Sequence, residues 1–475
     1  MDLSKSSLKI FSANLFSSIL YFFTIAYFAR ALGGSTLGVF FLFQALLSLL
    51  DILADFGLRG AIEKRLSEGD HQSSFIGAGI LIKIALSTAL ITGIWLFRTY
   101  VNQYLGEQLV GLLMVALVLY GVSKLAIKVL YGELRAGETA IIRIGERITW
   151  IVSSILFVTL GFGVEGLVWG LILGYIVSLG WSAFKINIYP SIPSQRQFHS
   201  LIKYMKYNVV TFVGWELYNW TDVAILGLFV TPELVSHYEL SWRIAMLVML
   251  VANSIVTTVF PQISAWDAEG ETQKIEDIAS KALTICLLFT IPAFFGTVLL
   301  SSDILRFLYG TGYTNAAVVL MILVGEQIIQ VFQLVYGHVL RGINLPSLSA
   351  KATAAGLTAN ATLNFVLISQ FDILGAAIGT TTASLLGTAL HWRYASKFIS
   401  IDLEMNKLRW IVISSTIMTF VLWVIQLFAL PSSLITFIII VVSGVGIYAG
   451  VLFVHPAFRK MILQLIDTLR RPSSI

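Results

Sequence analysis

The chain has 475 residues, of which 57% are hydrophobic and only 12% are charged. Soluble domains usually carry about 25% charged residues, so this composition excludes an ordinary water-soluble protein. The 31 Lys and Arg residues exceed the 26 Asp and Glu residues by five, an excess too slight and too dispersed for a nucleic-acid-binding protein. The single cysteine, Cys286, excludes an intrachain disulfide and a cysteine metal cluster. We therefore expect an all-α polytopic membrane protein.

Apolar segments of about 20 residues, the length that crosses the hydrocarbon core of a bilayer, follow one another along the chain. The first is of full length and is followed by no small-residue cleavage site, so we expect no cleaved signal peptide. A glycine-rich interruption at 161–163 separates the fifth from the sixth. We predict fourteen transmembrane helices: 8–30, 36–60, 74–97, 108–130, 142–161, 164–184, 205–230, 236–261, 278–301, 315–340, 348–370, 374–396, 408–430 and 433–454.

The distribution of cations predicts the orientation. Most Lys and Arg residues fall at the chain ends or in the even-numbered loops, whereas the opposite loops carry little more than Arg30, Arg98 and Arg306. By the positive-inside rule, both termini are expected in the cytoplasm. A count of thirteen helices would place them on opposite sides of the membrane.

A stretch containing Pro190 and Pro193 forms the longest connection and resembles a linker between two lobes. A shift of about 198 residues aligns the start of the second segment, at Leu37, with that of the eighth, at Val235. Because six is an even number, two six-helix repeats would be parallel, related by an axis along the membrane normal. The expected organisation is an N-lobe (1–184), a cytoplasmic linker (185–204), a C-lobe (205–396), two further helices (397–454) and a cytoplasmic amphipathic tail (455–475).

Five short motifs follow one another along the chain. They are Phe28-Ala29-Arg30-Ala31-Leu32-Gly33, Leu37-Gly38-Val39-Phe40, Asp55-Phe56-Gly57-Leu58, Phe307-Leu308-Tyr309-Gly310 and Leu374-Gly375-Ala376-Ala377-Ile378-Gly379-Thr380. With fourteen segments, the chain resembles, over nearly its whole length, the polysaccharide transporters of the multidrug/oligosaccharidyl-lipid/polysaccharide exporter superfamily. The resemblance implies a flippase of the cell membrane that moves an oligosaccharide on polyprenyl phosphate or diphosphate to the outer leaflet. Its expected partners are this lipid-linked glycan, membrane lipid and other membrane proteins of glycan assembly.

Polar side chains within the apolar segments are candidates for the transport path, because an ionised group in hydrocarbon costs about 2.5 to 3.5 kcal/mol. In segment 36–60, Gln44, Asp55 and Arg59 share one helical face with Ser48 and Asp51. We predict that Gln44, Asp55 and Arg59 contact the substrate. The alternative is an ion pair between Asp55 and Arg59, one turn apart, that only neutralises the helix end.

Two cations at membrane depth are further candidates for substrate binding. Lys83 lies about 14 Å inside its segment, where it either lines a cleft or extends its ammonium group toward the membrane surface. Arg243, with Asn253 on a similar face, offers the fork of donors that suits a phosphate. The alternative for Arg243 is a structural ion pair with Asp222.

Segment 315–340 carries a second polar face. Glu326, Gln330 and Gln333 continue at helical spacing toward Gly337 and Arg341. Amide groups can hydrogen-bond sugar hydroxyls without a fixed register, so we predict that this face binds the glycan. The alternative is polar packing against another helix.

A set of hard oxygen ligands predicts a site for a monovalent cation. Asp222, Asn360, Asn364 and Thr380 offer carboxylate, amide and hydroxyl oxygens, which do not suit zinc. The set is similar to the sodium site of the related lipid II flippases, although Asn364 stands where that resemblance expects an acid. Coupling to Na⁺, to H⁺ or to neither therefore stays open, Glu216 is a rival proton site, and helix packing is the alternative for the whole set.

Other classes of function are less compatible with the sequence. We expect no enzyme, no catalytic residues and no cofactor, because the six histidines are scattered and no DxD or Gly-rich phosphate motif occurs. No metal site is expected beyond that for a monovalent cation. A cation-coupled multidrug or metabolite exporter of the same superfamily is the main alternative. A scaffold for polysaccharide assembly is disfavoured by the cost of charged side chains at depth.

Overall fold

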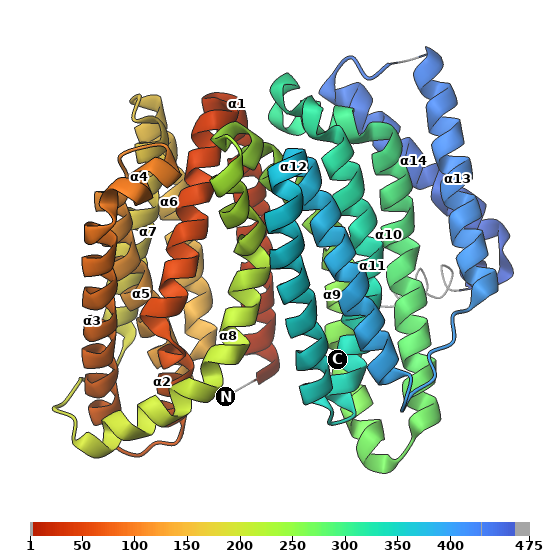
Figure 1. The fold of residues 1–475 in the computed structure, drawn as a ribbon. Coiled ribbons are helices and arrows are strands. Elements are labelled where there is room, and N and C mark those ends of the chain that lie inside the picture. The colour runs from red at the N-terminus through yellow and green to blue at the C-terminus, as the bar shows by residue number, and fades with distance from the viewer. Residues whose placement is uncertain (1–2, 429, 461–475) are drawn as a thin grey trace. The chain divides into compact units, whose positions relative to one another are not determined.

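The computed structural model describes residues 3–428 and 430–460, and the side chains of these residues except 3–16, 207–213 and 215. The regular elements in this part are all helices, so the predicted all-α class is confirmed (Figure 1). Their bounds are α1 Leu3–Asp55, α2 Leu58–Ser67, α3 Gln72–Leu96, α4 Arg98–Leu105, α5 Val110–Gly132, η1 Ala136–Glu138, α6 Thr139–Thr159, α7 Gly163–Lys185, α8 Gln195–Phe229, α9 Pro232–Glu269, α10 Thr272–Tyr309, η2 Thr311–Ala316, α11 Ala317–Gly342, α12 Pro346–Ala395, α13 Met405–Phe428 and α14 Leu434–Val454.

Two of these helices contain breaks where the sequence predicts separate membrane segments. In α1 the backbone leaves helical geometry at Gly33, where φ is 77°, a value that only glycine adopts without strain. In α12 it does so at Phe371 and Asp372. Both breaks fall between predicted segments, 8–30 and 36–60 in the first case and 348–370 and 374–396 in the second.

Among the described residues, ten helices are long and apolar enough to cross a membrane. Two of them, α1 and α12, each contain two predicted segments. The 21-residue α6 and the 35-residue α8 match the fifth and seventh predicted segments but are not among the ten. The protein is therefore a multi-pass membrane protein, and the count of fourteen stays a prediction.

Two predicted helix boundaries are wrong. Segment 36–60 is not continuous, because Phe56 and Gly57 have φ values of 43° and 84° and end the helix before α2 begins. Arg59 consequently lies on α2, not on the helix of Asp55. The helix predicted to begin at 205 begins at Gln195, where Ser194 and Gln197 form a reciprocal capping box.

The described chain divides into two compact units, residues 1–236 and 237–475. In the first unit, α6 and α5 pack against α7, and α8 packs against α1, α2 and α3. The division therefore assigns α8 to the first unit, whereas the predicted C-lobe begins with this helix. In the second unit, α10 packs against α11 and α13, and α11 packs against α12. The predicted arrangement of two parallel repeats stays a prediction.

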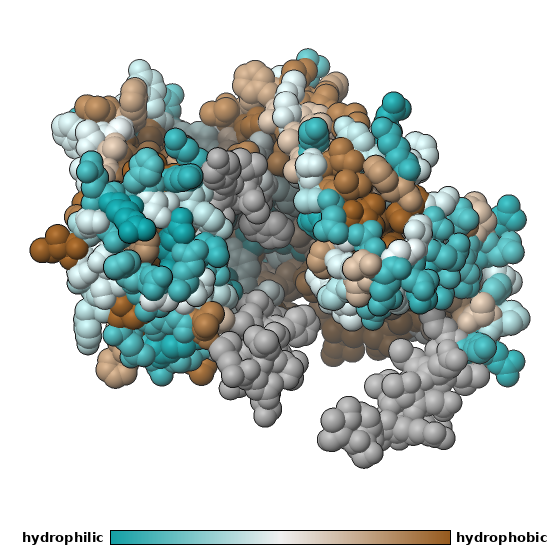
Figure 2. Space-filling view, turned by 90° about the horizontal axis from the view of Figure 1, so that it is seen from below, coloured by the Kyte–Doolittle hydropathy of each residue, from teal (hydrophilic) through white to brown (hydrophobic). Residues whose placement is uncertain are grey.

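Charged residues lie in the loops at one end of the first unit. Helix α8 begins at this end, where the connection from α2 to α3 also lies (Figure 1). Seen from this end, the surface is mostly hydrophilic (Figure 2). It is the end that the distribution of Lys64, Arg65 and Lys203 predicts to be cytoplasmic.

Candidate functional site

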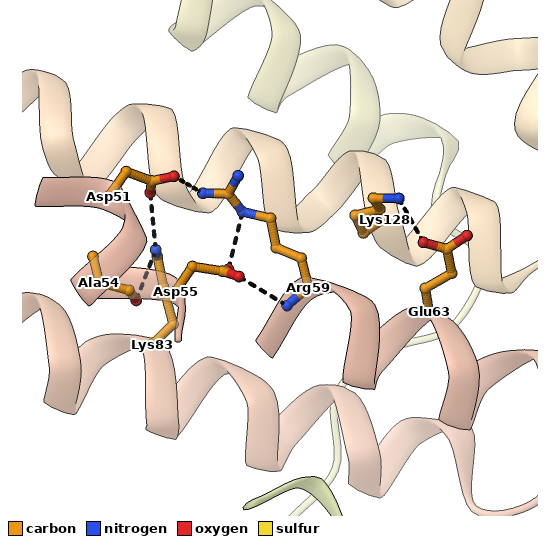
Figure 3. Close-up of polar contacts among 7 residues, drawn as sticks. All are labelled: Asp51, Ala54, Asp55, Arg59, Glu63, Lys83 and Lys128. Carbon is orange, nitrogen blue, oxygen red and sulfur yellow. Dashed lines mark hydrogen bonds and ion pairs between the residues drawn. The ribbon is translucent and has the colours of Figure 1, made fainter. Parts of the chain in front are cut away.

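Four charged side chains form a buried cluster in the first unit (Figure 3). Asp51 and Asp55 lie on the last turns of α1, Arg59 on α2 and Lys83 on α3, and each is at most 7% exposed. The guanidinium of Arg59 contacts the Asp51 carboxylate, and its Nε lies 3.0 Å from Asp55 Oδ1. Lys83 Nζ donates to the backbone oxygen of Ala54 at 3.0 Å and lies 3.5 Å from Asp51 Oδ1. Two acids are thus balanced by two bases.

The break between α1 and α2 builds this cluster. Because the chain turns at Phe56 and Gly57, Arg59 reaches back to both acids, and its backbone N–H donates to Asp55 Oδ2 at 3.4 Å. Asp55 thereby satisfies one of the backbone donors that the start of a helix leaves without a partner in the helix. Tyr120 of α5 lies against the other side, with its ring centre 5.6 Å from Arg59 Cζ.

The cluster contains one predicted alternative, the ion pair between Asp55 and Arg59, and a pairing of Lys83 that was not predicted. The ion pair between Asp55 and Arg59 is formed, and Lys83 is buried with two partners instead of extending toward the membrane surface. The sequence did not reveal that Asp51 bridges Arg59 and Lys83. Substrate binding by Asp55, Arg59 and Lys83 stays a prediction, as does that by Gln44, which accepts a hydrogen bond from Tyr21 at 3.3 Å.

A row of cations and aromatic rings lies in the same unit and was missed by the sequence analysis. Lys124 pairs with Glu146 at 2.9 Å, and Lys128 pairs with Glu63 at 2.5 Å. On α6, Arg143 donates to the Tyr131 hydroxyl and Arg147 lies over the Tyr21 ring. We call this set the cation–aromatic row: Lys124, Lys128, Arg143, Arg147, Tyr21, Tyr120, Tyr131 and Trp150.

The sequence contains a signal for this row. Lys124 and Lys128 are four residues apart on α5, and Arg143 and Arg147 are four residues apart on α6, so each pair shares a helical face. The positive-inside rule already explains Arg143 and Arg147 as cations near the cytoplasmic surface. Their contacts with aromatic rings were therefore not predicted from the sequence.

In the second unit, the polar face of α11 packs against α12. Glu326 is fully buried, and its Oε1 accepts hydrogen bonds from Gln330 at 2.7 Å and from Ser384 at 2.6 Å. Its Oε2 accepts from Gln327 at 2.5 Å. Gln333 is half-buried beside Gly387, where an added Cβ would lie 2.9 Å from its Oε1. These contacts favour helix packing for this face, and glycan binding by Glu326, Gln330 and Gln333 stays a prediction.

Arg243 on α9 has a local partner that the sequence analysis did not name. Its Nη2 lies 2.7 Å from Oε1 of Glu239, one turn earlier on the same helix. Asn253, further along α9, is exposed and donates to the backbone oxygen of Met249 at 3.0 Å. Binding of a phosphate by Arg243, and of substrate by Asn253, stays a prediction.

The break in α12 brings together three residues of the predicted cation set. Asn360 and Asn364 donate to Thr380 Oγ1 at 3.0 and 3.4 Å, and the Tyr238 hydroxyl lies 3.5 Å from the same oxygen. Asn364 and Thr380 are buried. Asp222, buried, and Glu216, half-buried, are on α8 in the first unit. Within the described part of the chain, no group of three or more His, Cys, Asp or Glu side chains could hold a metal ion.

Outside the membrane segments, one ion-pair network ties the connection between α5 and α6 to the end of α7. Arg135 donates to Glu138 at 2.7 Å and to the backbone oxygen of Lys185 at 2.6 Å. Hydrogen bonds from Arg135, followed by one from Lys185, lower the pKa of the Glu138 carboxyl below its usual value. The network therefore holds best when Glu138 is ionised.

Comparison with known proteins assigns the family. The family described as polysaccharide biosynthesis protein matches residues 27–318. The chain is 40% identical over 460 residues, 97% of its length, to the probable low-salt glycan biosynthesis flippase Agl15 of Haloferax volcanii, of which the match covers 98%. It is 28% identical to the probable flippase AglR of the same organism, with 98% of each chain covered.

Solved structures share the fold. The lipid II flippase MurJ in an inward closed conformation has a TM-score of 0.80 at 19% identity, with 95% of this chain and 99% of that chain covered. An inward-facing MATE multidrug resistance transporter of the MOP superfamily has a TM-score of 0.67 at 14% identity, with 80% and 94% covered. The chain therefore belongs to the polysaccharide biosynthesis protein family.

Proposed function

We propose that this protein flips an oligosaccharide linked to polyprenyl phosphate or diphosphate across the cytoplasmic membrane, for polysaccharide or glycan assembly. The observation that carries the proposal is the 40% identity, over 97% of the chain, to a protein named as a probable glycan biosynthesis flippase. Full-length similarity at this level favours a shared class of substrate with that flippase. The multidrug transporter shares the fold with this chain but only 14% of its sequence.

The chemistry of the first unit supports this proposal. A lipid-linked glycan has an anionic phosphate and a neutral sugar chain, and the cation–aromatic row offers guanidinium, ammonium and ring faces side by side. Guanidinium groups bind phosphate oxygens in pairs. The lipid tail would stay in the bilayer while the head group crosses by alternating access of two lobes, the usual mechanism of secondary transporters with repeated lobes.

Ion coupling and orientation belong to the same proposal. We place a monovalent cation, Na⁺ or H⁺, among Asp222, Asn360, Asn364 and Thr380, with Glu216 as the alternative proton site. The contacts of both asparagines with Thr380 support a shared oxygen site. Both termini are proposed to lie in the cytoplasm, and the membrane is proposed to be the plasma membrane.

Deleting the gene in its host tests the proposed function. A flippase deletion should accumulate a lipid-linked oligosaccharide on the cytoplasmic face, identified by mass spectrometry of lipid extracts, and the wild-type gene on a plasmid should remove it. Unchanged lipid-linked intermediates together with increased sensitivity to toxic compounds would instead support the exporter.

A further inference from the structure

Arg147 lies on an aromatic shelf formed by Tyr21 of α1 and Trp150 of α6. Its Cζ is 4.4 Å from the Tyr21 ring centre and 5.4 Å from the Trp150 ring centre, and the two ring centres are 5.3 Å apart. Neighbouring side chains hold the shelf in place. The side chain of Trp150 is buried and stacks on Phe40, with the two ring centres 6.3 Å apart. The Tyr21 hydroxyl is held by Gln44. The two rings that contact Arg147 are therefore themselves held by neighbouring side chains.

Arg147 differs from the neighbouring lysines in that it forms no salt bridge with a carboxylate among the described residues. The two lysines of the cation–aromatic row each have a carboxylate partner, Glu146 for Lys124 and Glu63 for Lys128. In the part of the chain that the structure describes, no salt bridge includes Arg147, although Glu146 lies within electrostatic range of it. Glu216 of α8 lies within electrostatic range of Lys124 and Arg59.

Arg147 lies inside α6 and not at its end, and its side chain is half-buried. It is the ninth residue of the helix, about 12 Å from the helix start at 1.5 Å per residue. A half-buried arginine usually pairs with an acid or extends its charged end into water. Cation–π contacts with the two rings stabilise Arg147 at this position without using its N–H groups as hydrogen-bond donors to a carboxylate.

We propose that Arg147, oriented by Tyr21 and Trp150, binds the phosphate or diphosphate group of the lipid-linked substrate. This inference rests on the proposed function and assigns to it a binding residue. The planar fork of a guanidinium matches two phosphate oxygens at once, and a side chain fixed by stacking loses little freedom on binding. Lys124, on the neighbouring helix α5 and 26% exposed at its side chain, supplies a second cation beside it.

Binding to the purified full-length protein in detergent tests the assignment. The probe is farnesyl diphosphate, compared with farnesol, which lacks the charged group, and with inorganic diphosphate, which lacks the lipid. Arg147→Gln should weaken binding of farnesyl diphosphate at least tenfold and leave farnesol unchanged, whereas Arg147→Lys, which keeps the charge without the fork, should lie between. Arg98→Gln is the matched control, because Arg98 also lies over a tryptophan, 5.0 Å from the ring centre of Trp95, but is exposed at the start of α4.

A second variant separates binding from folding. Tyr21→Leu keeps Arg147 and removes half of the shelf, so it should weaken binding of farnesyl diphosphate severalfold in protein whose gel-filtration profile is unchanged. Wild-type affinity in both Arg147→Gln and Tyr21→Leu would overturn the assignment and leave the proposed function intact. Equal affinity for inorganic diphosphate would overturn the lipid-linked ligand. A deletion strain without accumulated lipid-linked glycan would overturn the proposed function itself.

Discussion

Lys83 of α3 and Asp51 of α1 form an ion pair beside α5, with Lys83 Nζ 3.5 Å from Asp51 Oδ1. Gly121 of α5 faces this pair, and a Cβ added there would lie 2.5 Å from Lys83 Nζ and 3.4 Å from Asp51 Oδ1. The absence of a side chain at Gly121 thus lets α5 cover the charge cluster. The cluster is part of the packing among α1, α2, α3 and α5, so its charge balance should matter for stability.

The first prediction concerns that balance. Asp51→Asn leaves Arg59 and Lys83 buried with Asp55 as the remaining acid of the cluster, and removing one partner of a buried ion pair costs about 3 to 5 kcal/mol. Glu63→Gln breaks a half-exposed pair with Lys128, worth about 0 to 1 kcal/mol. Thermal unfolding in detergent should therefore show a large loss of stability for the first variant and a small one for the second.

Restoring the balance provides the control for this prediction. The double variant Asp51→Asn with Lys83→Met again has one acid, Asp55, and one base, Arg59. It should recover more than half of the stability lost in Asp51→Asn alone. A double variant as unstable as the sum of its two single variants would show that shape, not charge balance, holds the cluster.

The second prediction concerns the close approach of the extended stretch 186–194 to α3. Ser191 N–H donates to the Ser73 backbone oxygen at 3.0 Å, and a Cβ on Gly77 would collide with the Ser191 backbone oxygen. Gly77→Ala must therefore shift backbone and should cost about 1 to 3 kcal/mol. Gly93→Ala, on the same helix with nothing within 4 Å, should be neutral or stabilising by about 0.5 to 1 kcal/mol.

Thermal unfolding and limited proteolysis measure this difference. Gly77→Ala should be cleaved faster within 186–194, because the stretch is displaced from α3, and Gly93→Ala should be cleaved at the wild-type rate. Equal cleavage in the two variants would show that the stretch does not depend on its contact with Gly77.

The third prediction concerns the proposed cation site. Asp222→Asn should abolish ion dependence of transport more completely than Asn360→Ala, Asn364→Ala or Thr380→Ala, since Asp222 carries the negative charge of the set. Asn364→Asp should tighten ion binding, because a second carboxylate adds Coulomb attraction in a poorly screened interior. Sodium titration of purified protein and flipping assays in vesicles measure both effects.

The conservative variant Thr380→Ser controls for packing. It keeps the hydroxyl that accepts from both asparagines, so it should retain ion dependence that Thr380→Ala loses. Two results together would contradict the cation site: transport that does not depend on sodium or on the proton gradient, and a wild-type flipping rate for Asp222→Asn. The four residues would then serve only in helix packing.

The fourth prediction is the membrane topology. Reporters fused after Lys5 and after Arg471 should both report cytoplasm, and a reporter near Tyr100 should report the outside, because cations are concentrated in the loops assigned to the cytoplasm. An external C-terminus would contradict the count of fourteen helices.

The fifth prediction concerns pH. The pKa of Glu138 is lowered in the folded protein, so its hydrogen bonds with Arg135 stabilise the fold above the ordinary glutamate pKa of about 4.3 and are lost as pH falls through the lowered value. The side chains of Arg135 and Glu138 are 24% and 37% exposed, so solvent screening should keep the effect below about 1 kcal/mol. The difference in thermal midpoint between wild type and Glu138→Gln should be largest at neutral pH and should shrink below pH of about 4. A difference that stays constant with pH would exclude an ionic contribution.

The sequence by itself determined the features that depend on local periodicity. Hydropathy predicted a polytopic all-α protein and separated two segments at Gly33 and two more at Phe371 and Asp372, where the helices break. The sequence also predicted the pair of Asp55 and Arg59, although the two meet through the turn at Phe56 and Gly57 and not on one helix. Helical spacing placed Asn360 and Asn364 one turn apart on one face. These features follow from the 3.6-residue period and from the effect of special residues on the backbone.

The tertiary structure decided which helical faces meet. Asp51 reaches Lys83 because α1 packs on α3, Glu326 accepts from Ser384 because α11 packs on α12, and Arg147 stacks on Tyr21 because α6 packs on α1. The helical period determines the face of the helix on which a side chain lies. Which other helix packs against that face depends on shape and on contacts between segments far apart in the chain. The break at Phe56 shows the same limit, since a non-glycine residue keeps a positive φ only when its surroundings enforce it.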